Sequence, residues 1–258
     1  MNDFFATDYS QPGNFLVLAG ILFFIIFIRY IVFSGLFHYG LRRFFKGREM
    51  HHLDELGNRT LREMGWSVLT SLIFACIGMG LIILWQQGGT ALYLNLSDFP
   101  LWYLPVSLLI YLVLHETYYY WVHRWMHLPK VFPLVHRVHH ASHETNAHTS
   151  FSFHPLESLL QAIIIPVLLL VIPLHTSMLL VLLVIMTLSG TINHLGYEIF
   201  PSGWARHPLG RWIIGAAHHD RHHKRFRYNY GLYFTFWDRW MGTEDPEFDD
   251  YFEEITRR

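Results

Sequence analysis

The sequence has few of the residues on which several protein classes depend. Its single cysteine, Cys76, excludes an intramolecular disulfide and a zinc site built from thiolates. Charged residues make up only 15% of the 258 residues, and the net charge of -1 gives no reason to expect nucleic acid as a partner. Lysine and arginine are absent from 63–123 and from 138–205. A disulfide-stabilised secreted domain and a nucleic-acid-binding protein are therefore both disfavoured.

Long apolar stretches take the place of the missing charge. Hydrophobic residues make up 52% of the chain. A helix needs about 20 apolar residues to cross the hydrocarbon layer of a membrane. The stretches 14–33, 66–85 and 100–122 meet that length, and 156–195 can form two helices joined by a turn near Pro173. The sequence predicts an all-α integral membrane bundle of about four to five embedded helices.

The positive charges predict how these helices are oriented. All 19 lysines and arginines fall in the blocks 29–62, 124–137 and 206–258. Under the positive-inside rule these blocks face the cytoplasm. Every histidine cluster then lies on that side, in a histidine-rich helical cap, whether the membrane is the bacterial inner membrane or the endoplasmic reticulum. Arg29, near the inner end of the first helix, is expected to extend to the lipid headgroups.

Many of the 19 histidines recur at spacings that place their rings on one face of a helix. His123 and His127 form an HxxxH pair, and HxxHH occurs twice, in HRVHH at 136–140 and in HHDRHH at 218–223. Neighbouring imidazoles on one face repel one another when protonated, so such clusters need a partner. Neutral imidazole nitrogens are common ligands of metal ions. The spacing therefore predicts a metal centre.

The candidate ligands outnumber the positions around one ion. With His194, at the end of the last apolar stretch, they are His123, His127, His136, His139, His140, His194, His219, His222 and His223. One ion offers about four to six positions, so two ions are predicted. A shell made almost entirely of imidazole suits iron, zinc or copper, and spacing does not choose among them. Glu116, two helical turns before His123, is expected to accept a ring N–H from a ligand.

The membrane setting favours one reaction class and leaves two alternatives open. A redox metal pair beside apolar helices suits oxidation of a lipid C–H bond. A zinc-dependent hydrolase acting on lipid amides is the first alternative. A protein of metal transport or storage is the second, although the apolar stretches 66–85 and 156–174 offer no ladder of ionisable side chains across the bilayer.

Seven segments in fixed order carry a family resemblance, namely HETYYYWVHRWMH, HRVHH, FSFHPLES, NHLGYE, HHDRHH, NYG and WDRWMGT. Together they resemble the fatty acid hydroxylase and sterol desaturase superfamily, and methylsterol monooxygenases in particular. The resemblance implies a membrane-bound non-haem di-iron enzyme. Such an enzyme uses O2 and electrons from a separate electron-transfer protein to hydroxylate or desaturate an unactivated carbon of a lipid.

The resemblance also assigns roles to individual residues. It makes iron ligands of the nine histidines named above, and it gives His154 and His218 supporting roles beside them. Gly190 stands where related di-iron enzymes often carry a further ligand. The expected parts are membrane anchor helices and a linker at 1–113, the catalytic region at 114–243 and a tail at 244–258. Residues 118–121 and 151–153 are candidate walls for the alkyl part of the substrate.

Overall fold

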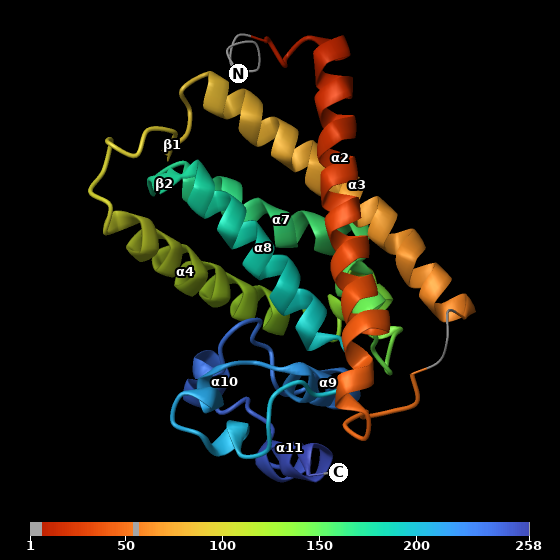
Figure 1. Cartoon of the computed structure of the whole chain (residues 1–258). Coiled ribbons are helices and arrows are strands. Elements are labelled where there is room, and N and C mark those ends of the chain that lie inside the picture. Colours follow the sequence, from red (N-terminus) through yellow and green to blue (C-terminus); the bar gives the residue numbers. More distant parts are fainter. Residues whose placement is uncertain (1–6, 54–56, 258) are drawn as a thin grey trace.

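The structure is a computed structural model that describes residues 7–53 and 57–257. Regular structure in this part of the chain is almost entirely helical (Figure 1). The exceptions are two short strands, β1 (Leu92–Tyr93) and β2 (Leu174–His175), which pair in parallel where two loops meet. The predicted all-α class is confirmed.

Five long helices form the bundle, and they are α2 (Pro12–Gly35), α3 (Asn58–Gln86), α4 (Tyr103–Met126), α7 (Pro155–Leu169) and α8 (Thr176–Asn193). A turn of π-helix, η1 (Leu36–Leu41), and a 3-10 turn, η2 (Arg42–Phe45), continue α2. Helix α2 with this extension, helix α3 and helix α8 are each long and apolar enough to cross a membrane. The described part of the chain thus has three candidate spans, fewer than the four to five embedded helices predicted, and the predicted span 100–122, which forms α4, is not among them.

The predicted helical hairpin is present, but its two halves differ in length. Helix α7 has 15 residues, which rise about 22 Å at 1.5 Å per residue. This is shorter than the hydrocarbon layer of about 30 Å. Pro166 lies near its end, and the chain turns through β2 into α8. Helix α7 is therefore too short to cross the membrane, and it packs against α3 and α4 instead.

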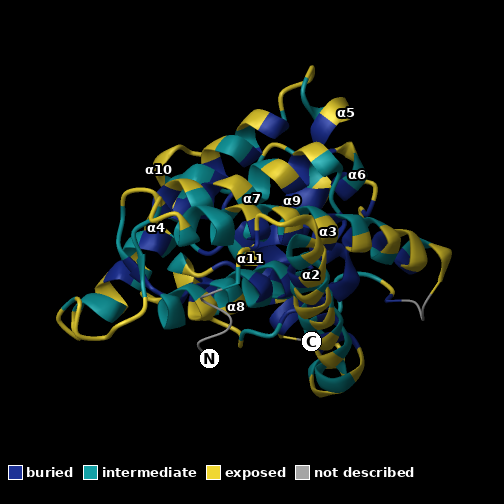
Figure 2. Ribbon diagram, turned by 90° about the horizontal axis from the view of Figure 1, so that it is seen from above, coloured by how far each residue is buried: buried dark blue, intermediate teal, exposed yellow. Residues whose placement is uncertain are grey.

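The outer faces of the long helices are apolar. On α2, Leu16, Phe24 and Ile28 are exposed, whereas Tyr30 and Ser34 are buried. Figure 2 shows buried residues concentrated in the middle of the bundle and exposed residues along the outer side of α2. Exposed apolar side chains in such continuous bands indicate surfaces that contact lipid. The chain is an integral membrane protein.

Short helices cover the end of the bundle at which α4 and α8 finish (Figure 1). They are α5 (Phe132–Val135), α6 (Arg137–His140), η3 (Ala147–Phe151), η4 (Trp204–Arg206), η5 (Gly210–Trp212), α9 (Ala216–Arg225), α10 (Phe236–Trp240) and α11 (Phe248–Thr256). The predicted histidine-rich helical cap therefore forms at one end of the membrane helices.

A buried carboxylate on α3 fixes the loop that follows α6. Glu63 accepts hydrogen bonds from the Ser142 hydroxyl at 2.5 Å, the Asn146 amide at 2.9 Å and the Thr149 hydroxyl at 3.2 Å. The Glu63 side chain is fully buried. Because Ser142 is two residues from His140, the Glu63 carboxylate also anchors the HRVHH segment, residues 136–140, to the membrane helices.

We expect Glu63→Ala to lower the free energy of unfolding by about 2–3 kcal/mol, since three buried donors lose a charged acceptor. Thermal or denaturant unfolding in detergent measures the change. Glu144→Ala is the matched control, because its exposed carboxylate pairs with Arg59 at 3.4 Å and contributes about 0–1 kcal/mol. Equal losses in the two variants would contradict the anchoring role of Glu63.

Candidate metal centre

The nine histidines predicted as ligands come from four places in the chain. His123 lies in the last turn of α4, and His127 follows its end. His136, His139 and His140 lie on the two short helices α5 and α6 or at their junction. His194 directly follows α8, while His219, His222 and His223 are on α9, as the pattern HHDRHH predicts.

Tertiary packing collects these rings into two adjacent groups. The five-histidine group consists of His123, His127, His136, His140 and His222, and the four-histidine group of His139, His194, His219 and His223. Within each group, one ring nitrogen of every residue lies within 4.8 Å of the others. The rings of His140 and His223 stack across the boundary with centroids 4.4 Å apart. Each group has the dimensions of a site for one metal ion.

Hydrogen bonds to backbone carbonyls determine which nitrogen of a ring faces inward. The Nδ1 atoms of three histidines donate to such oxygens, His123 to Tyr230 at 2.8 Å, His222 to Tyr228 at 2.7 Å and His194 to Gly190 at 2.6 Å. A carbonyl oxygen only accepts, so each Nδ1 carries the hydrogen. In a neutral ring, Nε2 then presents a lone pair toward the group.

The turn after α9 places two of these carbonyls. Phe226 and Asn229 adopt left-handed backbone conformations, with φ of 61° and 62°. The chain therefore reverses sharply after α9, and the carbonyls of Tyr228 and Tyr230 face the histidines. Asp238, on α10, accepts the backbone N–H of Tyr230 at 2.9 Å and holds this returning strand of chain in place. Burial raises the pKa of Asp238 to about 6.

Two inward-facing lone pairs approach each other closely in the five-histidine group. When Glu157 is ionised, the Nδ1 of His136 donates to its carboxylate at 2.8 Å, and the Nε2 of His136 then faces inward with a lone pair. The Nε2 atoms of His123 and His136 are 3.0 Å apart. With no hydrogen between them, these atoms repel unless a cation lies beside both. The donor set therefore fits a bound metal ion.

Unpartnered nitrogens support the same fit. The Nε2 of His127 and both ring nitrogens of His223 are buried and make no hydrogen bond to another described residue. Buried polar atoms without partners are unfavourable, and coordination of an ion would satisfy them. A shell built only from imidazole suits iron, zinc or copper.

The electrostatics of the cap keep these rings neutral. Burial, reinforced by the neighbouring imidazoles, lowers the pKa of His136, His139 and His140 well below the ordinary value. The same causes act on the three histidines of α9, His219, His222 and His223. Neutral imidazole is the form that binds metal, so no proton has to be removed near neutral pH.

Two carboxylates that support the site were missed by the sequence analysis. Glu157, at the start of α7, accepts the ring N–H of His136, the contact that was expected of Glu116. Glu198 accepts the backbone N–H of Ala217 at 2.8 Å and so holds the first turn of α9. Burial raises the pKa of Glu198 to about 7. Both lie in segments that carry the family resemblance, FSFHPLES and NHLGYE, which was the available signal.

The prediction for Glu116 was wrong in its partner. Its carboxylate accepts hydrogen bonds from the backbone N–H groups of Leu232 and Tyr233, at 3.1 and 2.7 Å, rather than from a histidine ring. Glu116 therefore anchors the segment after the NYG turn against α4. A carboxylate seven residues before His123 shares its helix face, but the segment between α9 and α10 contacts both residues, Tyr230 at His123 and Leu232 at Glu116.

His154 and His218 also lie apart from the two groups. His154 precedes α7, where its Nδ1 accepts the N–H of Leu156 at 3.3 Å and its ring faces Trp66. His218 is buried, but its ring packs on Phe248 with centroids 5.0 Å apart, and neither of its nitrogens has a hydrogen-bond partner among the described residues. His154 and His218 were expected to support the candidate ligands. Glu157 and backbone carbonyls make those contacts instead.

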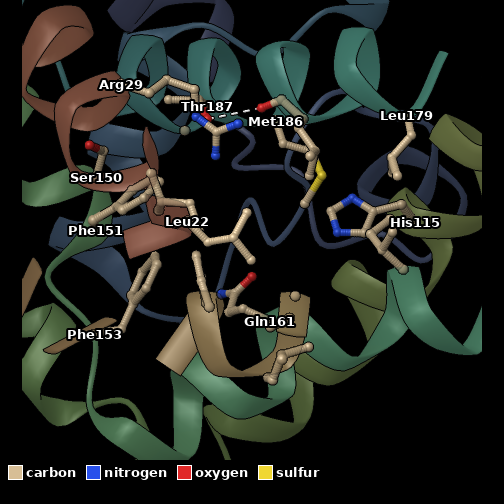
Figure 3. Close-up of a pocket in the computed structure, with 18 of the residues that line it drawn as sticks. Leu22, Arg29, His115, Ser150, Phe151, Phe153, Gln161, Leu179, Met186 and Thr187 are labelled. Carbon is tan, nitrogen blue, oxygen red and sulfur yellow. Dashed lines mark hydrogen bonds between the residues drawn. The ribbon is translucent and has the colours of Figure 1, made fainter. Parts of the chain in front are cut away.

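A cavity of about 340 Å³ lies beside the four-histidine group (Figure 3). His194 and Gly190 form part of its wall, and α2, α3, α7 and the remainder of α8 contribute most of the rest. A Cβ added at Gly190 would meet no atom within 4 Å. Of the predicted wall ranges, 151–153 contributes Phe151 and Phe153, whereas 118–121 contributes Tyr119 alone.

Comparisons with known proteins show the family to which this chain belongs. The profile of a family described as fatty acid hydroxylase matches residues 108–243. The Delta(7)-sterol 5(6)-desaturase ERG3B of Gibberella zeae is 29% identical over 96% of this chain and 74% of its own length. The lathosterol oxidases of Homo sapiens and Mus musculus are 31% and 33% identical over 75% of this chain. This chain spans only 64% of each lathosterol oxidase. No solved structure gives a significant match.

We expect Glu157→Ala to weaken metal binding about 10- to 100-fold, because His136 loses the acceptor that fixes its tautomer. Metal content after competition with a graded series of chelator concentrations measures the loss. His154→Ala is the control on the same turn of chain, and its metal content should match the wild type. Parallel behaviour of the two variants would contradict a role for Glu157 at the metal centre.

The metal-free protein should lose stability as the pH falls. Its buried histidines stay neutral in the folded state, whereas in the unfolded chain they take up protons below about pH 6.5. Each contributes up to about 1.4 kcal/mol per pH unit in that range. The unfolding temperature of chelator-treated protein should stay constant above about pH 7 and decrease toward pH 5. With metal bound, the decrease should begin at a lower pH. An unfolding temperature that is level down to pH 5 would be evidence against neutral rings.

Proposed function

Because the chain belongs to the fatty acid hydroxylase and sterol desaturase superfamily, we propose that it is an oxidoreductase that hydroxylates or desaturates an unactivated carbon of a membrane lipid. The observation that carries the proposal is the contact between the four-histidine group and an apolar cavity at His194. A metal centre at the wall of a lipid-sized cavity suits oxidation of a bound hydrocarbon.

The two histidine groups would hold two iron ions, one in each. Bound iron would supply activation of O2, with electrons delivered by a separate electron-transfer protein. The chain itself contributes neutral histidine rings whose Nε2 lone pairs would bind the metal. Glu157 and the carbonyls of Gly190, Tyr228 and Tyr230 set the direction of these rings. The histidine rings therefore need little rearrangement when metal binds.

The two groups differ in their access to substrate. Of the nine histidines, only His194 lines the cavity, so the substrate meets the four-histidine group. Gly190 leaves the cavity open beside His194, because no side chain projects there. Rings of Phe132 and Phe226 cover the five-histidine group at His140, with centroids 5.6 and 4.6 Å away. The reacting carbon is therefore presented to one side of the centre.

Apolar side chains around the cavity would position the hydrocarbon and exclude water. Residues such as Leu22, Phe74 and Ile77 offer no hydrogen bond, so a flexible lipid is held by shape and by burial of its surface. Exclusion of water protects the oxidising centre from unproductive reaction. The names of the similar proteins point to sterols as one substrate class to be tested.

We also propose that the cap faces the cytoplasm. The blocks 29–62, 124–137 and 206–258 hold every lysine and arginine of the chain. The last two blocks lie largely in the cap, next to the histidine groups. Positive charge on this end favours its retention on the cytoplasmic side, where a soluble electron donor can reach it.

Metal analysis and turnover together test the function. Protein grown with iron-57, purified in detergent and examined by elemental analysis and Mössbauer spectroscopy should contain about two coupled irons, one for each histidine group. Supplied with reductant and lipid extract, it should form oxidised lipid only in the presence of O2. Two zinc ions after growth in ample iron would favour a lipid amide hydrolase, and a variable load would favour transport or storage.

Single-ligand variants test the assignment of each group. We expect His222→Ala, in the five-histidine group, and His139→Ala, in the four-histidine group, each to lose iron and to reduce turnover by at least about 100-fold, more than loss of a supporting residue. His207→Ala is the control, since this exposed histidine packs on Trp204 away from both groups. Full activity in either ligand variant would remove that histidine from the ligand set.

A further inference from the structure

Arg29 enters the cavity rather than extending along the membrane surface. It lies on α2, within the first candidate span, and its side chain forms part of the cavity wall. Figure 3 shows its guanidinium directed toward the interior, beside Thr187 in that view. The expectation that Arg29 reaches for the lipid headgroups is therefore wrong in this structure.

The guanidinium has no partner within the described part of the chain. Its Nε is buried and makes no hydrogen bond. No carboxylate among the described residues forms an ion pair with it, although Glu63 and Glu157 are both buried in the same bundle. Glu63 is already occupied by three donors, and Glu157 by the ring of His136. Because arginine does not deprotonate in proteins, the cavity contains an unpaired positive charge.

An unpaired cation in a largely apolar cavity is unfavourable unless something else in its surroundings compensates for it. Removing a charge from water costs several kcal/mol even after the protein relaxes. A neutral hydroxyl would satisfy one hydrogen-bond donor and leave the charge unbalanced. A carboxylate balances the charge and matches the planar fork of the guanidinium with two parallel hydrogen bonds. The chemistry of Arg29 therefore favours an anionic ligand over a neutral one.

The remainder of the cavity suits a hydrocarbon chain. Leu22 and Ile26 of α2, Phe74 and Ile77 of α3 and Ile165 of α7 line it. Two further lining residues, Ile25 on α2 and Leu180 on α8, are 57% and 65% exposed. Exposed apolar residues on two membrane helices indicate that the cavity opens sideways toward lipid. A ligand could then enter from the bilayer without crossing water.

We propose that the cavity binds a lipid with a carboxylate head, whose two oxygens accept hydrogen bonds from Arg29 while its alkyl chain passes Gly190 and His194. The proposal rests on the proposed function, since it names the substrate class of the same site. It assigns Arg29 as the residue that distinguishes an acidic acyl lipid from an uncharged sterol. Because the carboxylate is held at Arg29, the same contact determines which carbon of the lipid's alkyl chain lies beside His194.

Direct binding tests the proposal without requiring turnover. Palmitate, hexadecanol and lathosterol are titrated into detergent-purified protein, and binding is measured by calorimetry. Palmitate should bind more tightly than either neutral probe. Arg29→Leu should weaken palmitate about tenfold or more, as expected for loss of one partner of a desolvated ion pair, and should leave hexadecanol within about twofold. Arg29→Lys keeps the charge but not the planar fork, so its affinity for palmitate should lie between those of the wild type and Arg29→Leu.

Arg43→Leu is the matched control, because Arg43 is exposed in η2 and lies over the ring of Phe44, outside the cavity. It should bind all three probes as the wild type does. Tighter binding of lathosterol than of palmitate, an equal loss of palmitate and hexadecanol in Arg29→Leu, or no binding of palmitate would each overturn the proposal. Failure of the oxidation assay with Arg29-dependent palmitate binding intact would overturn the proposed function alone.

Discussion

The approach of neutral imidazole lone pairs is the interaction on which the rest of this structure depends. Nε2 atoms only 3.0 Å apart, as in His123 and His136, are unfavourable unless an ion lies between the rings. The surrounding chain holds them in place through the other nitrogen of each ring. Glu157 does so for His136, and the backbone carbonyls of Tyr228, Tyr230 and Gly190 do so for three further histidines. A metal ion bound at these rings would therefore add part of its binding free energy to the free energy of folding.

This arrangement explains why several carboxylates near the histidine groups hydrogen-bond to other parts of the chain. Glu198 holds the start of α9, Asp238 holds the turn that carries Tyr230, and Glu116 holds the segment after it. Glu63 holds the loop beyond His140. These carboxylates contact the segments that carry or adjoin the histidines, not the histidine rings themselves. Together they fix the chain segments whose histidines point inward, so that each candidate metal site consists of imidazole rings.

The cavity makes one side of the candidate metal centre accessible. It reaches the histidines only at His194, where Gly190 leaves space, and it opens toward lipid beside Ile25 and Leu180. Membrane helices otherwise exclude unpaired charge because the hydrocarbon layer cannot solvate it. Arg29 inside this cavity is therefore the feature most specific to a ligand, and in the proposed binding mode it would hold the lipid head away from the carbon to be oxidised.

The sequence by itself determined the helical class, the apolar stretches and the grouping of the histidines, because helix period and hydrophobic length are local properties. Spacing within HRVHH and HHDRHH indicated metal binding, but it could not show that His139 joins a different group from its neighbour His140. Only the tertiary structure decided that. Contacts between distant segments also decided the partner of Glu116, the role of Glu157 and the direction of Arg29. Each of these depends on which side chain reaches a given point in space, and sequence separation carries no information about that distance.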